Sequence, residues 1–184
     1  GLPLFSTLAR LILPLMNSDQ KSGQIGVVFG ATGLVGGYVL DELLKSDQYY
    51  RVVALLRMPL PFSHPKLWQI LLEDFSRLED RKEELKGDVY FCCLGTTIKK
   101  AGSQEAFRKV DLALPIGIAW LAESQFISRL VVMSSLGADP KASNFYLKTK
   151  GEMEKRIREI FTGNLKIVRP SLLMGHRKES RLGE

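Results

Sequence analysis

A tyrosine and a lysine four residues apart, Tyr146 and Lys150, carry the clearest chemistry in this sequence. On a helix, residues at this spacing lie on one face, one turn apart. The tyrosine hydroxyl can exchange a proton with a substrate oxygen while the lysine ammonium stabilises the phenolate. This pairing suits the interconversion of a carbonyl and an alcohol. Because the same spacing also arises by chance, its meaning depends on the elements that place it.

Two serines precede this pair at the end of an apolar run. Residues 129–133 (RLVVM) predict a strand, and Ser134 and Ser135 follow it directly. Open α/β sheets bind ligands at the carboxyl ends of their strands, so a serine there could hold the substrate oxygen. Both serines remain candidates, because either spacing to Tyr146 would serve.

The rest of the chain is organised around residues 25–37, IGVVFGATGLVGG. An apolar run leads into a glycine turn, and a helical pattern follows, which is the entry to a dinucleotide-binding βαβ unit. The helix N-terminus supplies N–H donors and a positive dipole for a diphosphate, and glycine permits its close approach. The spacing is G-x-x-G-x-x-G rather than the commoner G-x-G-x-x-G. The predicted cofactor contacts in this turn are Gly30, Ala31, Thr32, Gly33, Leu34, Val35 and Gly36.

Arg57 follows a second predicted strand, residues 51–56. Proteins selective for NAD carry an acidic residue near this position to bind the ribose 2′-hydroxyl. No carboxylate stands here, and an arginine favours a 2′-phosphate instead. We therefore expect NADP(H); the alternative is an ordinary surface arginine at a strand end.

Strand-like runs and helical patterns alternate along the whole chain. Further strands are predicted at residues 67–72, 89–94, 129–133 and 165–168, and helices at 76–86, 104–124 and around residues 146–157. This alternation predicts a single α/β domain with a Rossmann-type doubly wound parallel sheet. Ser76 with Glu79 predicts a capping box, and Pro115 predicts a kink. Gly95 and Thr96 follow the fourth strand, beside the glycine turn, and are further cofactor candidates.

Composition narrows the class of protein. The chain has 184 residues, 45% of them hydrophobic and 25% charged, as in ordinary globular domains. The net charge is +6, but the basic residues are scattered, which makes nucleic acid an unlikely partner. Cys92 and Cys93 are adjacent in an apolar run, which predicts core residues in a reduced, cytoplasmic protein. His64 and His176 are isolated, so no metal site is predicted.

Residues 1–24 are expected to be a leader or extension of uncertain origin, followed by the domain at 25–184. The apolar start is broken by Arg10 and Pro14 and is too short to span a bilayer, so we expect no membrane span. Met16 and the polar residues after it could mark the start of the native domain. The alternative is an amphipathic helix packed on the body or on a second copy.

Longer segments extend these motifs. They are GATGLVG (30–36), CCLGTTIKKAGS (92–103), FRKVD (107–111), SSLGADPKASNFYLKTKGEMEK (134–155) and RPSLLMGHRKESRLGE (169–184). Together they resemble the short-chain dehydrogenases/reductases, and more closely an atypical branch, the Tat-interacting-protein 2 oxidoreductase-like family. The resemblance spans nearly all of residues 25–184.

This resemblance implies NADP(H) bound to a Rossmann fold, with Tyr146 as proton donor and acceptor. The implied cofactor contacts are Thr32, Gly33, Leu34, Val35, Arg57, Cys93, Leu94, Tyr146, Lys150, Leu173 and Arg181. Pro170 is a further cofactor candidate. Ser171 stands where many relatives have glycine, which affects the expected packing of the nicotinamide. The family usually continues beyond the position of Glu184, so we expect this domain to lack its C-terminal end.

Two functional hypotheses follow. The first is an NADP(H)-dependent oxidoreductase acting on an unidentified small carbonyl or alcohol, with Tyr146, Lys150 and a serine as the catalytic set. The second is an NADPH-binding regulatory or scaffold protein with little or no turnover, which would work through a protein partner or a homodimer.

Overall fold

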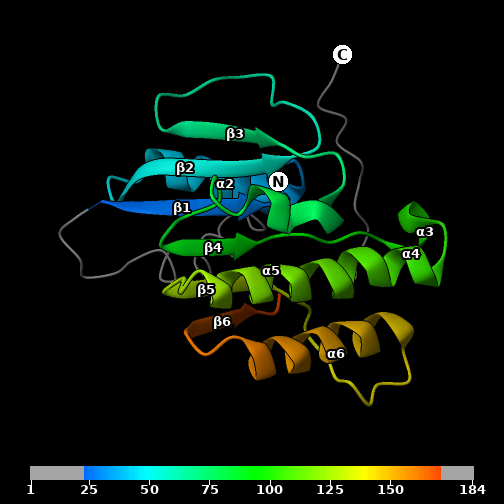
Figure 1. Ribbon diagram of the computed structural model, residues 1–184. Helices are drawn as coiled ribbons and strands as arrows, with labels where there is room; N and C mark the ends of the chain where they lie inside the picture. Colours follow the sequence, from blue (N-terminus) through cyan, green and yellow to red (C-terminus); the bar gives the residue numbers. More distant parts are fainter. Residues whose placement is uncertain (1–22, 171–184) are drawn as a thin grey trace.

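One six-stranded parallel sheet forms the centre of the computed structural model, which describes residues 23–170. The strand order is β3-β2-β1-β4-β5-β6, which confirms the Rossmann-type doubly wound fold in a single domain (Figure 1). The strands are β1 (Gln24–Phe29), β2 (Tyr49–Leu56), β3 (Leu67–Leu71), β4 (Val89–Cys92), β5 (Arg129–Met133) and β6 (Asn164–Val168). The helical segments are α2 (Leu34–Lys45), η1 (Phe75–Arg81), α3 (Ile98–Ala101), α4 (Gln104–Arg108), η2 (Lys109–Ala113), α5 (Leu114–Ser124) and α6 (Phe145–Ile160).

Helices cover both faces of the sheet. The central strands are therefore continuously apolar and do not alternate between apolar and polar residues. Successive side chains of a strand point to opposite faces. In β1, Val28 packs into the cluster that includes the buried side chains of α2, while Val27 and Phe29 pack with residues of α5 and α6. Figure 1 shows α2 behind the sheet and η1 and α5 in front of it.

The chain reverses its direction of winding between β1 and β4. β1 pairs in parallel with β2 on one side and with β4 on the other, so it lies at the topological switch point. Ligands of open α/β sheets bind outside the carboxyl ends of the strands at this point. The arrowheads of β2, β3 and β4 mark this edge on the right of Figure 1.

The predicted long helix at residues 104–124 follows one helical path with an irregular turn inside it. α4 leads into the π-helical turn η2, and α5 follows, with Pro115 in its first turn. Proline lacks an N–H and its ring collides with the carbonyl four residues earlier. The wider π turn directly before α5 accommodates this, so the predicted kink takes the form of a π turn.

The predicted capped helix at residues 76–86 was wrong in its cap and its length. Asp74, not Ser76, is the N-cap, and its side chain accepts a hydrogen bond from the Ser76 N–H at 2.9 Å. The segment is a 3₁₀ helix that ends at Arg81, and Leu78 is its buried residue. With so little apolar surface to pack on the sheet, tertiary contacts do not extend it into a regular helix.

The start of α6 is fixed from two sides. The Asn144 side chain caps the helix by accepting from the Leu147 N–H at 2.9 Å. Gly151 lies so close to the loop after β5 that a Cβ there would be 2.1 Å from the carbonyl carbon of Asp139. The cap fixes where α6 begins, and the close approach at Gly151, with the hydrogen bond from the Asp139 N–H to the Leu147 carbonyl at 3.2 Å, packs the first half of the helix against the loop that follows the two serines.

Candidate functional site at the carboxyl edge of the sheet

The glycine turn after β1 lies directly against the end of β4. Gly30 has a φ of +88°, and a Cβ there would lie 2.9 Å from the backbone of Cys93. A Cβ on Gly36 would lie only 2.0 Å from the Gly30 carbonyl oxygen. Both glycines are therefore required by the protein's own backbone packing. The structure brings the predicted cofactor residues 30–36 together with Cys93 and Leu94.

Gly33 differs from its two neighbours in the motif. It is exposed, and the nearest atom to a Cβ there would be the Gly30 oxygen at 3.4 Å, an ordinary contact. Gly33 is also the N-cap of α2 and offers no side-chain cap, whereas Asp74, Ser103 and Asn144 cap their own helices. The first N–H groups of α2 thus lack a side-chain acceptor beside an open surface. This cradle fits the diphosphate of a dinucleotide.

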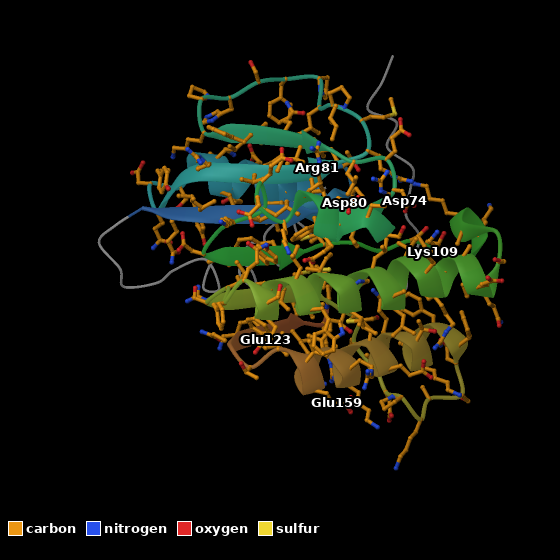
Figure 2. The ribbon with its side chains drawn as sticks, viewed as in Figure 1. Asp74, Asp80, Arg81, Lys109, Glu123 and Glu159 are labelled. Atoms are coloured by element: carbon orange, nitrogen blue, oxygen red, sulfur yellow. The ribbon has the colours of Figure 1, made fainter. Side chains whose placement is uncertain are left out.

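Arg57 lies exposed directly after β2, on the same edge. Its guanidinium has no hydrogen bond or ion pair within the described part of the chain. Beyond it on this edge, Asp74 follows β3 and lies near Lys109 of η2 (Figure 2). An unpaired guanidinium at the end of β2 is available for a phosphate group.

Lys150 is almost completely buried, and its ammonium lies 2.7 Å from Oδ1 of Asp111. The side chains are 4% and 1% exposed, respectively, so this is a buried ion pair. A Cβ on Gly95 would lie 3.5 Å from Asp111 Oδ1 and 4.0 Å from Lys150 Nζ. The loop after β4 therefore runs directly over the pair.

Asp111 was missed as a site residue by the sequence analysis. Its second oxygen, Oδ2, accepts a hydrogen bond from the Thr96 N–H at 2.9 Å, which ties the η2 turn to the loop after β4. The available signal was a carboxylate four residues after Phe107, on the buried stripe of the helix, and four before Pro115. A charge in that position needs a buried partner, and the sequence does not reveal which one.

The two serines differ in what their hydroxyls contact. Ser134 donates to Oε1 of Glu154 at 2.6 Å. Ser135 makes only a 3.4 Å contact to the carbonyl of Leu136 within residues 23–170. Tyr146 packs its ring against Phe107, with centroids 5.7 Å apart, and no hydrogen bond of its hydroxyl is formed within the same residues. Ser135 and Tyr146 therefore keep hydroxyl groups that other side chains do not occupy.

Glu154 is a second residue that sequence reasoning did not single out. Its carboxylate is buried, and besides Ser134 it accepts from Nε of Arg169 at 2.8 Å and from Nη2 of Arg158 at 3.1 Å. Burial, the largest influence, raises the pKa of Glu154, but the hydrogen bonds from Arg169 and Ser134 outweigh it, and the net shift is downward. The carboxylate is held in its ionised form.

The surroundings of the two cysteines do not favour a thiolate: Cys92 is buried and Cys93 is half-buried. Burial raises the pKa of the Cys92 thiol to about 12, and burial raises the pKa of Cys93 as well. A thiol that stays protonated is unreactive. Cys93 contributes its backbone to the site, through the contact with Gly30.

The remaining predicted residues lie at or beyond the end of β6. Pro170 is buried, and its carbonyl accepts a hydrogen bond from the Leu136 N–H at 3.3 Å. Leu173 and Arg181 lie outside the described residues. Within residues 23–170 there is no cluster of three potential metal ligands, and no helix there is long and apolar enough to cross a membrane.

Known proteins match this chain in sequence and in fold. A family described as NAD(P)H-binding matches residues 30–181, from Gly30 in the turn after β1 to Arg181. The chain belongs to this family. It is 36% identical to protein HTATIP2 of Rattus norvegicus over 176 residues, which cover 94% of this chain and 72% of that protein. The resemblance to the Tat-interacting-protein 2 branch is thereby confirmed.

A second group of relatives carries the name FMP52. The chain is 34% identical to the mitochondrial protein FMP52 of Candida albicans over 157 residues, 83% of this chain and 69% of that protein. It is also 34% identical to FMP52 of Saccharomyces cerevisiae over 158 residues, 85% of this chain and 68% of that protein.

Solved structures support the fold. The Bordetella bronchiseptica enzyme WbmG, solved with NAD and UDP, superposes with a TM-score of 0.66 at 14% identity, over 83% of this chain. UDP-glucose 4-epimerase from Thermotoga maritima superposes with a TM-score of 0.64 at 12% identity, over 79% of this chain. The chain spans 55% and 54% of these two structures, which are evidence for the fold alone.

Alanine substitution should separate the two roles of glycine in the turn. We expect Gly33→Ala to change the free energy of unfolding by less than about 1 kcal/mol while weakening dinucleotide binding about tenfold or more. Gly36→Ala should cost several kcal/mol, roughly 3 or more, because its Cβ would overlap the Gly30 carbonyl. Urea unfolding and calorimetric titration measure the two effects. Unchanged dinucleotide affinity in folded Gly33→Ala would contradict the cradle.

The buried ion pair should behave as a unit. We expect Asp111→Ala to lower the free energy of unfolding by about 3–5 kcal/mol, because it leaves the Lys150 charge buried and unpaired. Adding Lys150→Met to this variant should recover a large part of the loss, since no charge then remains buried. Urea unfolding of the double-mutant cycle measures the coupling. Additive losses would mean that the two side chains do not depend on each other.

Proposed function

We propose that this chain is an NADP(H)-dependent oxidoreductase of the short-chain type that interconverts a small carbonyl compound and an alcohol. The observation that carries the proposal is the fixed ammonium of Lys150. Asp111 holds it beneath the loop after β4, one helical turn from Tyr146 and on the same edge as the glycine turn. A buried cation one helical turn from a phenol without a side-chain partner suits proton transfer to a carbonyl oxygen.

The chain's own residues have distinct roles in this proposal. The N–H groups at the start of α2 bind the diphosphate, and Arg57 binds the 2′-phosphate. Bound NADPH would supply the hydride to the carbonyl carbon. Tyr146 gives its hydroxyl proton to the carbonyl oxygen, so that the alcohol forms, and the Lys150 charge stabilises the phenolate left behind. Ser135 is the serine proposed to hold the substrate oxygen, because the Ser134 hydroxyl is engaged by Glu154.

A regulatory role remains a second candidate on a specific observation. The Lys150 ammonium already has a carboxylate partner, and Ser134 belongs to an ion-pair cluster, so both have structural roles without any turnover. An NADPH-binding regulator would keep the fold and the cofactor and would use neither group in chemistry. Its partner would be another protein or a second copy of this chain.

The cytoplasm is the proposed location, because both cysteines are free. The FMP52 relatives carry a mitochondrial description, which makes the mitochondrion the alternative. Fractionation of cells that express the tagged chain distinguishes the two locations.

Replacing the proposed proton donor tests the enzyme against the regulator. In Tyr146→Phe we expect NADPH-dependent reduction of 4-nitrobenzaldehyde or phenanthrenequinone to fall about 100-fold or more, with NADPH affinity within about twofold of wild type. Tyr50→Phe, on the exposed start of β2, is the matched control and should keep full activity. Equal rates in Tyr146→Phe and wild type would rule out Tyr146 as the donor.

Cofactor preference tests Arg57. We expect wild type to bind NADPH in preference to NADH, and Arg57→Ala to lose about 2 kcal/mol for NADPH alone, since charge-assisted hydrogen bonds to the 2′-phosphate are worth that much. Arg156→Ala, an exposed arginine on α6, serves as the control for net charge. Calorimetric titration with both nucleotides measures the difference. Parallel losses for NADPH and NADH would contradict the proposed phosphate contact.

A further inference from the structure

Glu154 connects α6 with the ends of β5 and β6 at the carboxyl edge of the sheet. It lies on α6 one turn beyond Lys150. Its carboxylate accepts one hydrogen bond from Ser134 after β5 and two from Arg169 after β6, from Nε and Nη2. Arg158 supplies a fourth bond from within α6. The two carboxylate oxygens thus have partners at all of their roughly four acceptor sites.

The strand ends that Glu154 joins run on together past the sheet. The Ser134 N–H donates to the Val168 carbonyl at 2.8 Å, and the Leu136 N–H donates to the Pro170 carbonyl at 3.3 Å. Ser135 lies between these two bonds. The position of the serine loop and the exit of the chain at Pro170 are therefore set by the same few contacts.

In this cluster the carboxylate is buried, while its partners Arg158 and Arg169 are 53% and 42% exposed. The Glu154 side chain is 1% exposed, whereas those of Arg156 and Glu159, paired on the same helix, are 54% and 45% exposed. Because a buried carboxylate needs partners at its acceptor sites, Glu154 requires its donors to stay where they are. Its directional bonds do define where three backbone segments lie relative to one another.

We propose that Glu154 is a positioning residue for the nicotinamide half of the bound dinucleotide. It acts through Ser134 and Arg169, by fixing the ends of β5 and β6 against α6. In a doubly wound sheet the two halves of the dinucleotide bind on opposite sides of the switch point. The adenosine half lies on the β1–β3 side, with Arg57, and the nicotinamide half on the β4–β6 side, with Lys150 and Pro170. The inference rests on the proposed cofactor binding.

The experiment compares two ligands that share the adenosine half. NADPH and adenosine 2′,5′-bisphosphate are titrated into wild type, Glu154→Gln and Arg169→Lys by calorimetry. In both variants we expect NADPH affinity to fall about tenfold, and affinity for the bisphosphate to stay within about twofold. Arg169→Lys keeps the charge but cannot make the bidentate hydrogen bonds to Glu154. It therefore reports on positioning even where Glu154→Gln folds poorly.

Glu159→Gln is the matched control, because it removes a carboxylate from the exposed face of the same helix (Figure 2). It should leave both affinities unchanged. If Glu154→Gln and Arg169→Lys bind NADPH as tightly as wild type, the positioning role alone is overturned. It is also overturned if both variants lose affinity for NADPH and the bisphosphate in parallel, because the cluster would then be purely structural. Failure of wild type to bind either ligand overturns the proposed function, and this inference with it.

Discussion

The buried positive charge of Lys150 is the constraint on which the rest of the carboxyl edge depends. An ammonium withdrawn from water must be compensated, and here Asp111 compensates it at 2.7 Å. Asp111 reaches this position from the π turn η2, directly before the helix that begins with Leu114 and Pro115. Its other oxygen fixes the Thr96 N–H, so the loop after β4 is held as well. One ion pair thereby links α6, the α4–α5 path and the end of β4.

A second constraint is steric and meets the first at the same edge. The backbone at Gly30 presses against Cys93, and α2 begins so close to this turn that Gly36 has no room for a Cβ. The end of β4 is thus confined between the glycine turn on one side and the Asp111–Lys150 pair on the other. A dinucleotide bound over the start of α2 would extend across β4 towards Lys150. The family's NAD(P)H binding and the proposed proton transfer are in this way parts of one surface.

The sequence was sufficient for the fold, because strand and helix periods and the glycine turn are local signals. Strands at residues 24–29, 49–56 and 129–133 fell where the apolar runs are, and the parallel order follows from the helices between them. The cap at Asp74 was missed because it competes with Ser76 two residues on. Asp111 and Glu154 were missed for a different reason. Each pairs with a residue that is distant in the sequence and lies outside its own helix: Asp111 with Lys150, and Glu154 with Arg169. The proposal of Ser135 rather than Ser134 likewise rests on the position of Glu154, which spacing alone does not give.

We propose above all that NADPH bound at this edge transfers a hydride to a carbonyl substrate, and is not merely bound there. The most direct measurement uses NADPH deuterated at C4, each stereoisomer in turn, with wild-type protein and 4-nitrobenzaldehyde, and mass spectrometry of the alcohol. A fixed nicotinamide presents one face to the substrate, so we expect deuterium in the alcohol from one stereoisomer only. Tight NADPH binding with no deuterated alcohol from either would contradict the claim, and the chain would then be an NADPH-binding protein without this chemistry.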